Sequence, residues 1–166
     1  MRMGNTSLPP FHETVHPDWI DYNGHLNEAY YLLIFSHATD SMIDWMGMDA
    51  ASREAERRSV YTLETHILYM LEVKVGERVE VRTRLLDLDG KRIHLFHTMI
   101  REDGEIACMS EMVMACIDMT GPRICAFAEG PAARLDALFE RHCEEPWPDK
   151  AGRSLGLGNG RRSARS

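Results

Sequence analysis

Between residues 28 and 46 the apolar positions recur every three or four residues, and polar side chains fill the opposite stripe. This period predicts one long amphipathic helix of about five turns. Asn27 directly precedes the pattern and suits an N-cap, because its side-chain oxygen can accept a free backbone N–H. Gly47 directly follows the pattern and suits the C-terminal stop. The apolar stripe consists of Tyr31, Phe35, Ala38, Met42 and Trp45.

On both sides of this helix the pattern changes to a period of two, which is typical of strands. A short strand is expected at Phe11–Val15, and the alternation resumes after a polar linker at Asp49–Ser59. Asp89-Gly90 and Asp103-Gly104 indicate two hairpin turns. A short amphipathic helix is expected at Ala132–Cys143. The four strands expected before that helix are residues 61–70, 78–88, 91–101 and 105–119.

This order of elements predicts an α+β fold in which one antiparallel five-stranded sheet wraps around the long central helix, the hotdog arrangement. An open sheet leaves unpaired edges, and the helix would be only half covered by it. We therefore expect a homo-oligomer, either a dimer or a dimer of dimers.

The composition is that of a single soluble domain with a hydrophobic core: 166 residues, 44% hydrophobic and 27% charged. No apolar stretch reaches the length of a membrane span. The formal net charge of −7 argues against nucleic acid as the main partner. Residues 150–166 hold five basic residues and no acidic ones, so residues 1–149 carry −12. We expect one hotdog domain at residues 1–149 and a basic Gly/Arg/Ser-rich tail at residues 150–166.

Cysteine usage and missing motifs narrow the chemistry. The first twenty residues lack the apolar segment of a signal peptide, so the four cysteines predict a cytoplasmic protein with reduced, structural thiols. His94 and His97 are three positions apart in a strand and point to opposite faces, so they cannot share a metal ion. The chain has no P-loop motif and no GxGxxG motif that opens a helix. We expect no metal and no cofactor.

The loop from Asp18 to Asn27 places an acid, an imidazole and two carboxamides directly before the long helix. Asp21 could attack a carbonyl or activate water, and Gly24 allows the backbone to approach a ligand closely. Free N–H groups at the helix start could hold developing negative charge. These are the parts of an acyl-transfer site. The same residue types are also ordinary in turns and caps, and the residues alone favour both interpretations equally.

The run Asp21-Tyr22-Asn23-Gly24-His25-Leu26-Asn27, followed by Tyr31, resembles the D-x-x-G-H-x-N…Y pattern of hotdog acyl-CoA thioesterases of the 4-hydroxybenzoyl-CoA thioesterase type. More narrowly, residues 17–50 and 61–97 look like the betainyl-CoA thioesterases of bacterial carnitine breakdown. The resemblance extends from about residue 11 to 120. It implies hydrolysis of a short-chain acyl-CoA, in the narrow case betainyl-CoA, to the free acid and CoA. The alternatives are a thioesterase for another short or aromatic acyl-CoA, or a non-catalytic acyl-CoA-binding hotdog protein.

For the loop, the resemblance implies that Asp21 is the catalytic carboxylate, either as nucleophile or as general base. The thioester carbonyl would point at backbone N–H groups from Asn27 to Tyr30. His25 would orient the carboxylate or the substrate, unless it only ties the loop to the helix. The catalytic residues implied in this way are Asp21, His25 and Asn27.

Betainyl-CoA carries a trimethylammonium group, and aromatic faces commonly hold such groups. Trp19 and Tyr22 are the expected cage. Glu64, expected on one strand face with Thr62 and His66, could meet the cationic head or act as a second acid; the other interpretation is an interface glutamate with a satisfied partner. The implied substrate-binding residues are Trp19, Tyr22, Asn23, Gly24, Tyr31 and Glu64. Candidates for the CoA phosphates, or else solvent-facing positions, are Arg82, Arg84, Lys91, Arg92 and the tail arginines.

Overall fold

A computed structural model describes residues 7–156, so the last ten residues of the expected basic tail lie outside the described residues. The elements are β1 (Phe11–Thr14), the 3-10 helix η1 (Pro17–Trp19), α1 (Glu28–Trp45), α2 (Ala50–Glu56), β2 (Arg58–Tyr69), β3 (Arg78–Leu88), β4 (Arg92–Ile100), β5 (Ile106–Asp118), β6 (Arg123–Ile124) and α3 (Glu129–His142).

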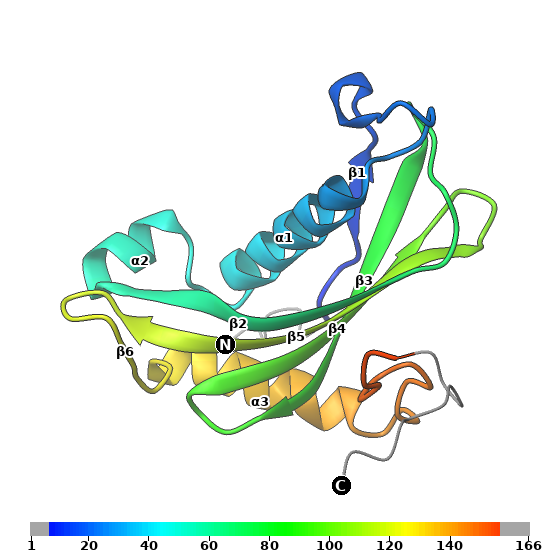
Figure 1. Cartoon of the computed structure of the whole chain (residues 1–166). Coiled ribbons are helices and arrows are strands. Elements are labelled where there is room, and N and C mark those ends of the chain that lie inside the picture. The colour runs from blue at the N-terminus through cyan, green and yellow to red at the C-terminus, as the bar shows by residue number, and fades with distance from the viewer. Residues whose placement is uncertain (1–6, 157–166) are drawn as a thin grey trace, which may run out of the picture.

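The strands form one antiparallel sheet in the order β1-β3-β4-β5-β2, which curls around α1 (Figure 1). The expected α+β hotdog architecture is confirmed. A sixth strand, the two-residue β6, pairs with the end of β5 and was not expected. Within the described chain, β2 lies at one edge of the sheet and β1 at the other. The face that packs against α1 is called the inner face below, and the other the outer face.

The long helix begins and ends where its caps predict. Asn27 Oδ1 accepts the Ala29 N–H at 3.0 Å, and Gly47 follows the last turn with φ +90°. The buried positions of α1 are Tyr31, Ile34, Phe35, Ala38, Thr39, Met42 and Ile43. They form one continuous stripe against the sheet, as the period requires.

The expected polar linker at Asp49–Ser59 is partly helical, and this is a correction. Residues 50–56 form α2, capped by the Asp49 side chain, which accepts the Ser52 N–H at 2.9 Å. None of the residues of α2 is buried. The helix therefore lacks the apolar period from which a sequence analysis recognises helices.

The helix α3 begins at Glu129, earlier than expected, and crosses the C-terminal end of α1. Arg134 Nη1 donates to the Trp45 carbonyl at 2.7 Å. Leu135 and Leu138 are fully buried in the same core cluster as Met42. The helix thus closes the end of the core opposite the start of α1.

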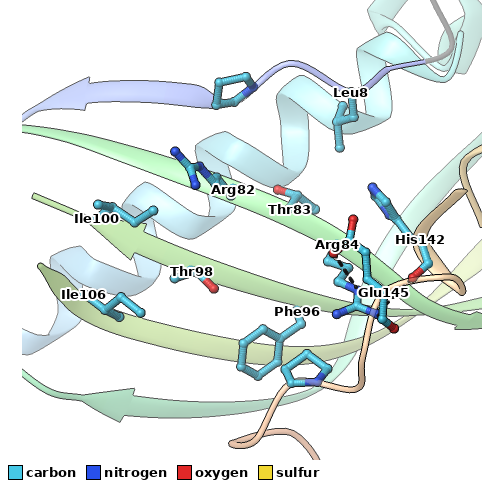
Figure 2. A pocket seen from close by; sticks show the side chains of 12 residues that line it. Leu8, Arg82, Thr83, Arg84, Phe96, Thr98, Ile100, Ile106, His142 and Glu145 are labelled. Atoms are coloured by element: carbon cyan, nitrogen blue, oxygen red, sulfur yellow. Dashed lines mark hydrogen bonds and ion pairs between the residues drawn. The ribbon is translucent and has the colours of Figure 1, made fainter. Parts of the chain in front are cut away.

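Arg84 holds the C-terminal end of α3 in place. Its guanidinium group donates to the carbonyls of His142, Glu145 and Pro146 and lies close to the Glu145 carboxylate (Figure 2). The following segment continues across the outer face, where Trp147 contacts His94 and the Gly152 N–H donates to Glu111 at 2.7 Å.

A bulge interrupts β2 between Thr62 and Glu64. Thr62 pairs with Met114, which is buried in the core, whereas Glu64 pairs with Val113 on the opposite face. Leu63 is the extra residue, and it breaks the alternation. The expectation that Thr62 and Glu64 share a face is therefore wrong, and Glu64 lies on the outer face.

His94 and His97 point to opposite faces, as expected. His97 is fully buried, stacks on Phe35 and lies between the hydroxyls of Thr39 (3.0 Å) and Thr83 (2.9 Å). The Thr39 hydroxyl donates to the Phe35 carbonyl and so accepts from His97 Nε2–H, while Nδ1 accepts from Thr83. Burial lowers the pKa of His97 to about 4, so the ring is neutral.

Candidate active site

The loop before α1 is closed by backbone hydrogen bonds. Ile20 and Leu26 form an antiparallel bridge, and the Asp21 N–H donates to the His25 carbonyl at 3.0 Å. The Gly24 N–H donates back to the Asp21 carbonyl at 3.0 Å, and Gly24 itself has φ +81°. A left-handed conformation at that point suits glycine.

The Asp21 carboxylate is positioned by this turn. Asp21 is half-buried, and its Oδ1 accepts the Asn23 N–H at 2.8 Å. No donor among residues 7–156 contacts Oδ2. One carboxylate oxygen is therefore fixed while the other remains available for a substrate or a water molecule.

Asp21 lies in a groove of about 340 Å³ that opens at the start of α1. The groove is bounded by the loop, the first turn of α1 and the end of β2 with the residues after it. Its lining residues are Asp21, His25, Leu26, Glu28, Tyr31, Tyr69, Met70, Leu71 and Glu72.

The backbone N–H groups at the start of α1 differ in whether they have a hydrogen-bond acceptor. The Asn27 N–H donates to the Trp19 carbonyl at 2.9 Å, the Ala29 N–H to Asn27 Oδ1 and the Tyr30 N–H to the Asn27 carbonyl at 3.0 Å. The Glu28 N–H has no acceptor among residues 7–156. Among the amides from Asn27 to Tyr30, that of Glu28 is the donor left for a ligand oxygen.

Two tyrosine rings meet edge to face in the groove. Tyr31 and Tyr69 lie 5.4 Å apart with an interplanar angle of 84°. Each hydroxyl donates to a backbone carbonyl at 3.2 Å, that of Tyr31 to Leu71 and that of Tyr69 to Glu28. Burial raises the pKa of Tyr31 to about 12 and also raises the pKa of Tyr69. Both phenols are therefore neutral and fixed in orientation.

The His25 side chain contacts the Glu72 carboxylate and not the Asp21 carboxylate. Its Nε2 lies 3.0 Å from Glu72 Oε2, and its carbonyl accepts the Asp21 N–H. The side chain thus ties the loop to the segment after β2. Cys108 pairs in register with Tyr69, and burial raises the pKa of its thiol to about 12, so it is not a nucleophile at neutral pH.

The structure brings together only some of the predicted site residues. Asp21, His25 and Tyr31 line the groove, with Asn23 and Gly24 in the adjoining turn. Trp19 stacks on Tyr30 at 5.6 Å, and Tyr22 is 97% exposed; neither lines the groove. Glu64 does not line it either. The proposed substrate roles of these three residues remain predictions.

Sequence reasoning considered Tyr69 only as one of several aromatic residues and preferred Trp19 and Tyr22, and it did not name Glu72. Tyr69 and Glu72 enter the groove because the end of β2 packs beside the start of α1, which is a tertiary relationship. The alternation of β2 does place Tyr69 on one face with Ile67, and this was the available signal. Glu72 lies after the strand and left no signal in the pattern.

Most of the basic residues considered for binding the CoA phosphates already contact other groups of the protein. Arg84 is occupied by the carbonyls after α3, and Arg92 pairs with Asp89. Arg82 pairs with Glu80 and lines a depression of about 490 Å³ on the outer face (Figure 2). Among residues 7–156, no group of three or more His, Cys, Asp or Glu side chains is placed to hold a metal ion.

Comparisons with known proteins connect this geometry to a family. The chain is 42% identical over 151 residues to a betainyl-CoA thioesterase of Pseudomonas aeruginosa, covering 90% of this chain and 95% of that protein. It is 41% identical to an L-carnitine dehydrogenase/betainyl-CoA thioesterase of Agrobacterium fabrum, of which it covers 29%. A Staphylococcus aureus protein solved in complex with CoA is 30% identical, with a TM-score of 0.85 over 89% of this chain and 94% of that one.

No helix within residues 7–156 is long and apolar enough to cross a membrane. The Thioesterase-like superfamily matches residues 15–138, a segment that runs from the end of β1 into α3 and includes the whole groove. The chain belongs to the Thioesterase-like superfamily.

Proposed function

We propose that the protein is an acyl-CoA thioesterase that hydrolyses betainyl-CoA to glycine betaine and CoA. The observation that carries this proposal is the placement of the Asp21 carboxylate and the unoccupied Glu28 amide at one groove. Thioester hydrolysis needs a carboxylate at the carbonyl carbon and a donor at the carbonyl oxygen. The relatives that act on betainyl-CoA support the choice of acyl group.

The Glu28 N–H would donate a hydrogen bond to the thioester carbonyl oxygen. This hydrogen bond strengthens as the oxygen becomes an anion in the transition state. A single such donor contributes roughly 3 to 4 kcal/mol to transition-state stabilisation. In one route Asp21 Oδ2 attacks the carbonyl carbon, the C–S bond breaks, CoA leaves as the thiolate, and water then hydrolyses the acyl-aspartyl anhydride. In the other, Asp21 takes a proton from water while that water attacks. The geometry is compatible with both routes.

We further propose that the protein works as a homo-oligomer in which copies pair along β2. This strand is an edge of the sheet, and large hydrophobic side chains are exposed along it and just after it. They are Tyr61, Leu63 and Val75, and the groove residues Tyr69, Met70 and Leu71 are exposed beside them. An exposed apolar edge of this kind is normally covered by a partner. Light scattering on the purified protein should give twice or four times the mass of one chain.

A cytoplasmic location completes the proposal. All four cysteines are free thiols, and two of them, Cys108 and Cys116, are buried. This usage is typical of a reducing compartment.

The decisive experiment is a thiol-release assay with betainyl-CoA, acetyl-CoA and benzoyl-CoA, on the wild type and on Asp21→Asn. Asparagine keeps an oxygen for the Asn23 N–H but cannot act as nucleophile or base. We expect preference for betainyl-CoA and a loss of kcat of about 100-fold or more in Asp21→Asn. Full activity of that variant would exclude the mechanism. A wild type inactive on every thioester, yet able to bind CoA, would favour the acyl-CoA-binding alternative.

A further inference from the structure

The groove beside Asp21 is negatively charged. Three of its lining residues are carboxylates, Asp21, Glu28 and Glu72, and none is lysine or arginine. His25 is the one basic side chain in the lining, and it is already paired with Glu72. An acyl group with a positive charge would be attracted into this groove, whereas a neutral group would gain nothing from its field.

The same groove presents aromatic surface to its contents. Tyr31 is 4% exposed and forms part of the floor, while Tyr69 is 51% exposed and forms part of the wall. Because both hydroxyls donate to backbone carbonyls, the ring of Tyr69 is held in one orientation. A cation over a tyrosine face is attracted by the ring quadrupole.

These two features suit a quaternary ammonium group in particular. Such a group has no N–H to donate, so it cannot be recognised by directed hydrogen bonds. It can be recognised by nearby carboxylates, through Coulomb attraction alone, and by aromatic faces. The groove supplies Glu72 and Tyr69 for these two purposes, and the His25 and Glu28 contacts hold them in position.

We propose that Tyr69 and Glu72 are the residues that select a cationic, quaternary ammonium acyl group. This inference rests on the proposed thioesterase function and deepens it. It also moves the expected site of cation recognition from Trp19 and Tyr22 in the loop to the end of β2.

The test compares two thioesters of the same shape. In 3,3-dimethylbutanoyl-CoA a carbon atom replaces the quaternary nitrogen of betainyl-CoA, so the two differ by one charge. The measured quantity is the ratio of kcat/KM for betainyl-CoA to that for the neutral isostere. Effects of a substitution on general activity or folding cancel in this ratio.

Tyr69→Leu should lower the ratio about 5- to 30-fold, because the aromatic face is lost. Tyr69→Phe keeps the face and loses only the hydrogen bond to Glu28, so the ratio should stay within about twofold of wild type. Glu72→Gln should lower it by about 3- to 10-fold, with a smaller effect at high salt. Glu54→Gln, on the exposed helix α2, is the matched charge control and should leave the ratio unchanged.

The outcomes separate the two proposals. Hydrolysis of both thioesters with an unchanged ratio in Tyr69→Leu and Glu72→Gln would overturn the assignment of these residues and leave the thioesterase proposal intact. A ratio that falls only in Trp19→Ala and Tyr22→Ala would also overturn it, in favour of the loop. Hydrolysis of neither thioester by the wild type would instead reject the proposed function.

Discussion

The side chain of Asn27 accepts the N–H of Ala29 at 3.0 Å, and among residues 7–156 no acceptor bonds the preceding amide, that of Glu28. One residue thus serves both the stability of the helix and the polarity of the groove. The side chain of an N-cap residue bonds the second or third amide of a helix, so the first amide stays available for a ligand oxygen.

Asn27→Ala should therefore affect stability and activity together. We expect a loss of about 1 kcal/mol in the free energy of unfolding, measured by urea denaturation. We also expect kcat for thioester hydrolysis to fall by about tenfold, because the first turn is no longer fixed. Asn27→Ser, which can still cap the helix, should recover most of both losses.

The control for this prediction is Asp49→Ala, which removes the cap of α2. It should lower stability by a similar amount, about 1 kcal/mol, and leave kcat/KM unchanged. Equal losses of activity in Asn27→Ala and Asp49→Ala would show that the effect is one of general stability and not of the groove.

Gly24 and Gly90 form a second matched pair. Both have positive φ, +81° and +78°, and a Cβ at either position would meet nothing within 4 Å. Each Gly→Ala substitution should therefore cost about 1 kcal/mol of stability from backbone conformation alone. Only Gly24→Ala should reduce kcat/KM, because Gly24 closes the turn that positions Asp21. Unaltered activity in Gly24→Ala would contradict this role.

His97 should make stability depend on pH. Its folded-state pKa is depressed to about 4 from 6.5, so the unfolded chain binds the proton more readily. The contribution of the neutral ring is complete above pH 6.5 and is lost as the pH falls to about 4, by roughly 3 kcal/mol in total. Urea denaturation at several pH values should show this fall in the wild type. In His97→Gln, which keeps one donor and one acceptor, the slope should be smaller by about one proton.

Arg84 and Arg82 lie on the same strand and should differ in their effect on stability. The side chain of Arg84 is 18% exposed and bonds three carbonyls at and just beyond the C-terminal end of α3, whereas that of Arg82 is 69% exposed and pairs with Glu80. Arg84→Met should cost about 2 to 3 kcal/mol of stability and increase proteolysis between α3 and Gly152. Arg82→Met should change stability by less than about 0.5 kcal/mol. Comparable losses would contradict the anchoring role of Arg84.

Features that depend on neighbours in the sequence could be predicted, and features that depend on packing could not. The long helix, its Asn27 cap and its Gly47 stop are local, as are the hairpins at Asp89-Gly90 and Asp103-Gly104. The helix α2 was not predicted because none of its residues is buried, so its sequence has no apolar period. The predicted face of Glu64 was wrong because the bulge at Leu63 does not show in the alternating sequence pattern. The position of Asp21 in its loop made it a candidate, and the residue does line the groove, whereas Tyr69 enters the groove only through the packing of β2 beside α1.

The bulge at Leu63 reverses the alternation of inward- and outward-facing residues along β2. From Arg58 to Thr62 the even-numbered residues face inward, and from Glu64 to Tyr69 the odd-numbered residues do. If Leu63 paired as a regular strand residue, the whole strand would follow a single alternation, so that either Val60 would leave the core or Tyr69 would leave the groove. The bulge therefore allows Val60 in the core and Tyr69 in the groove to lie on the same face of one strand.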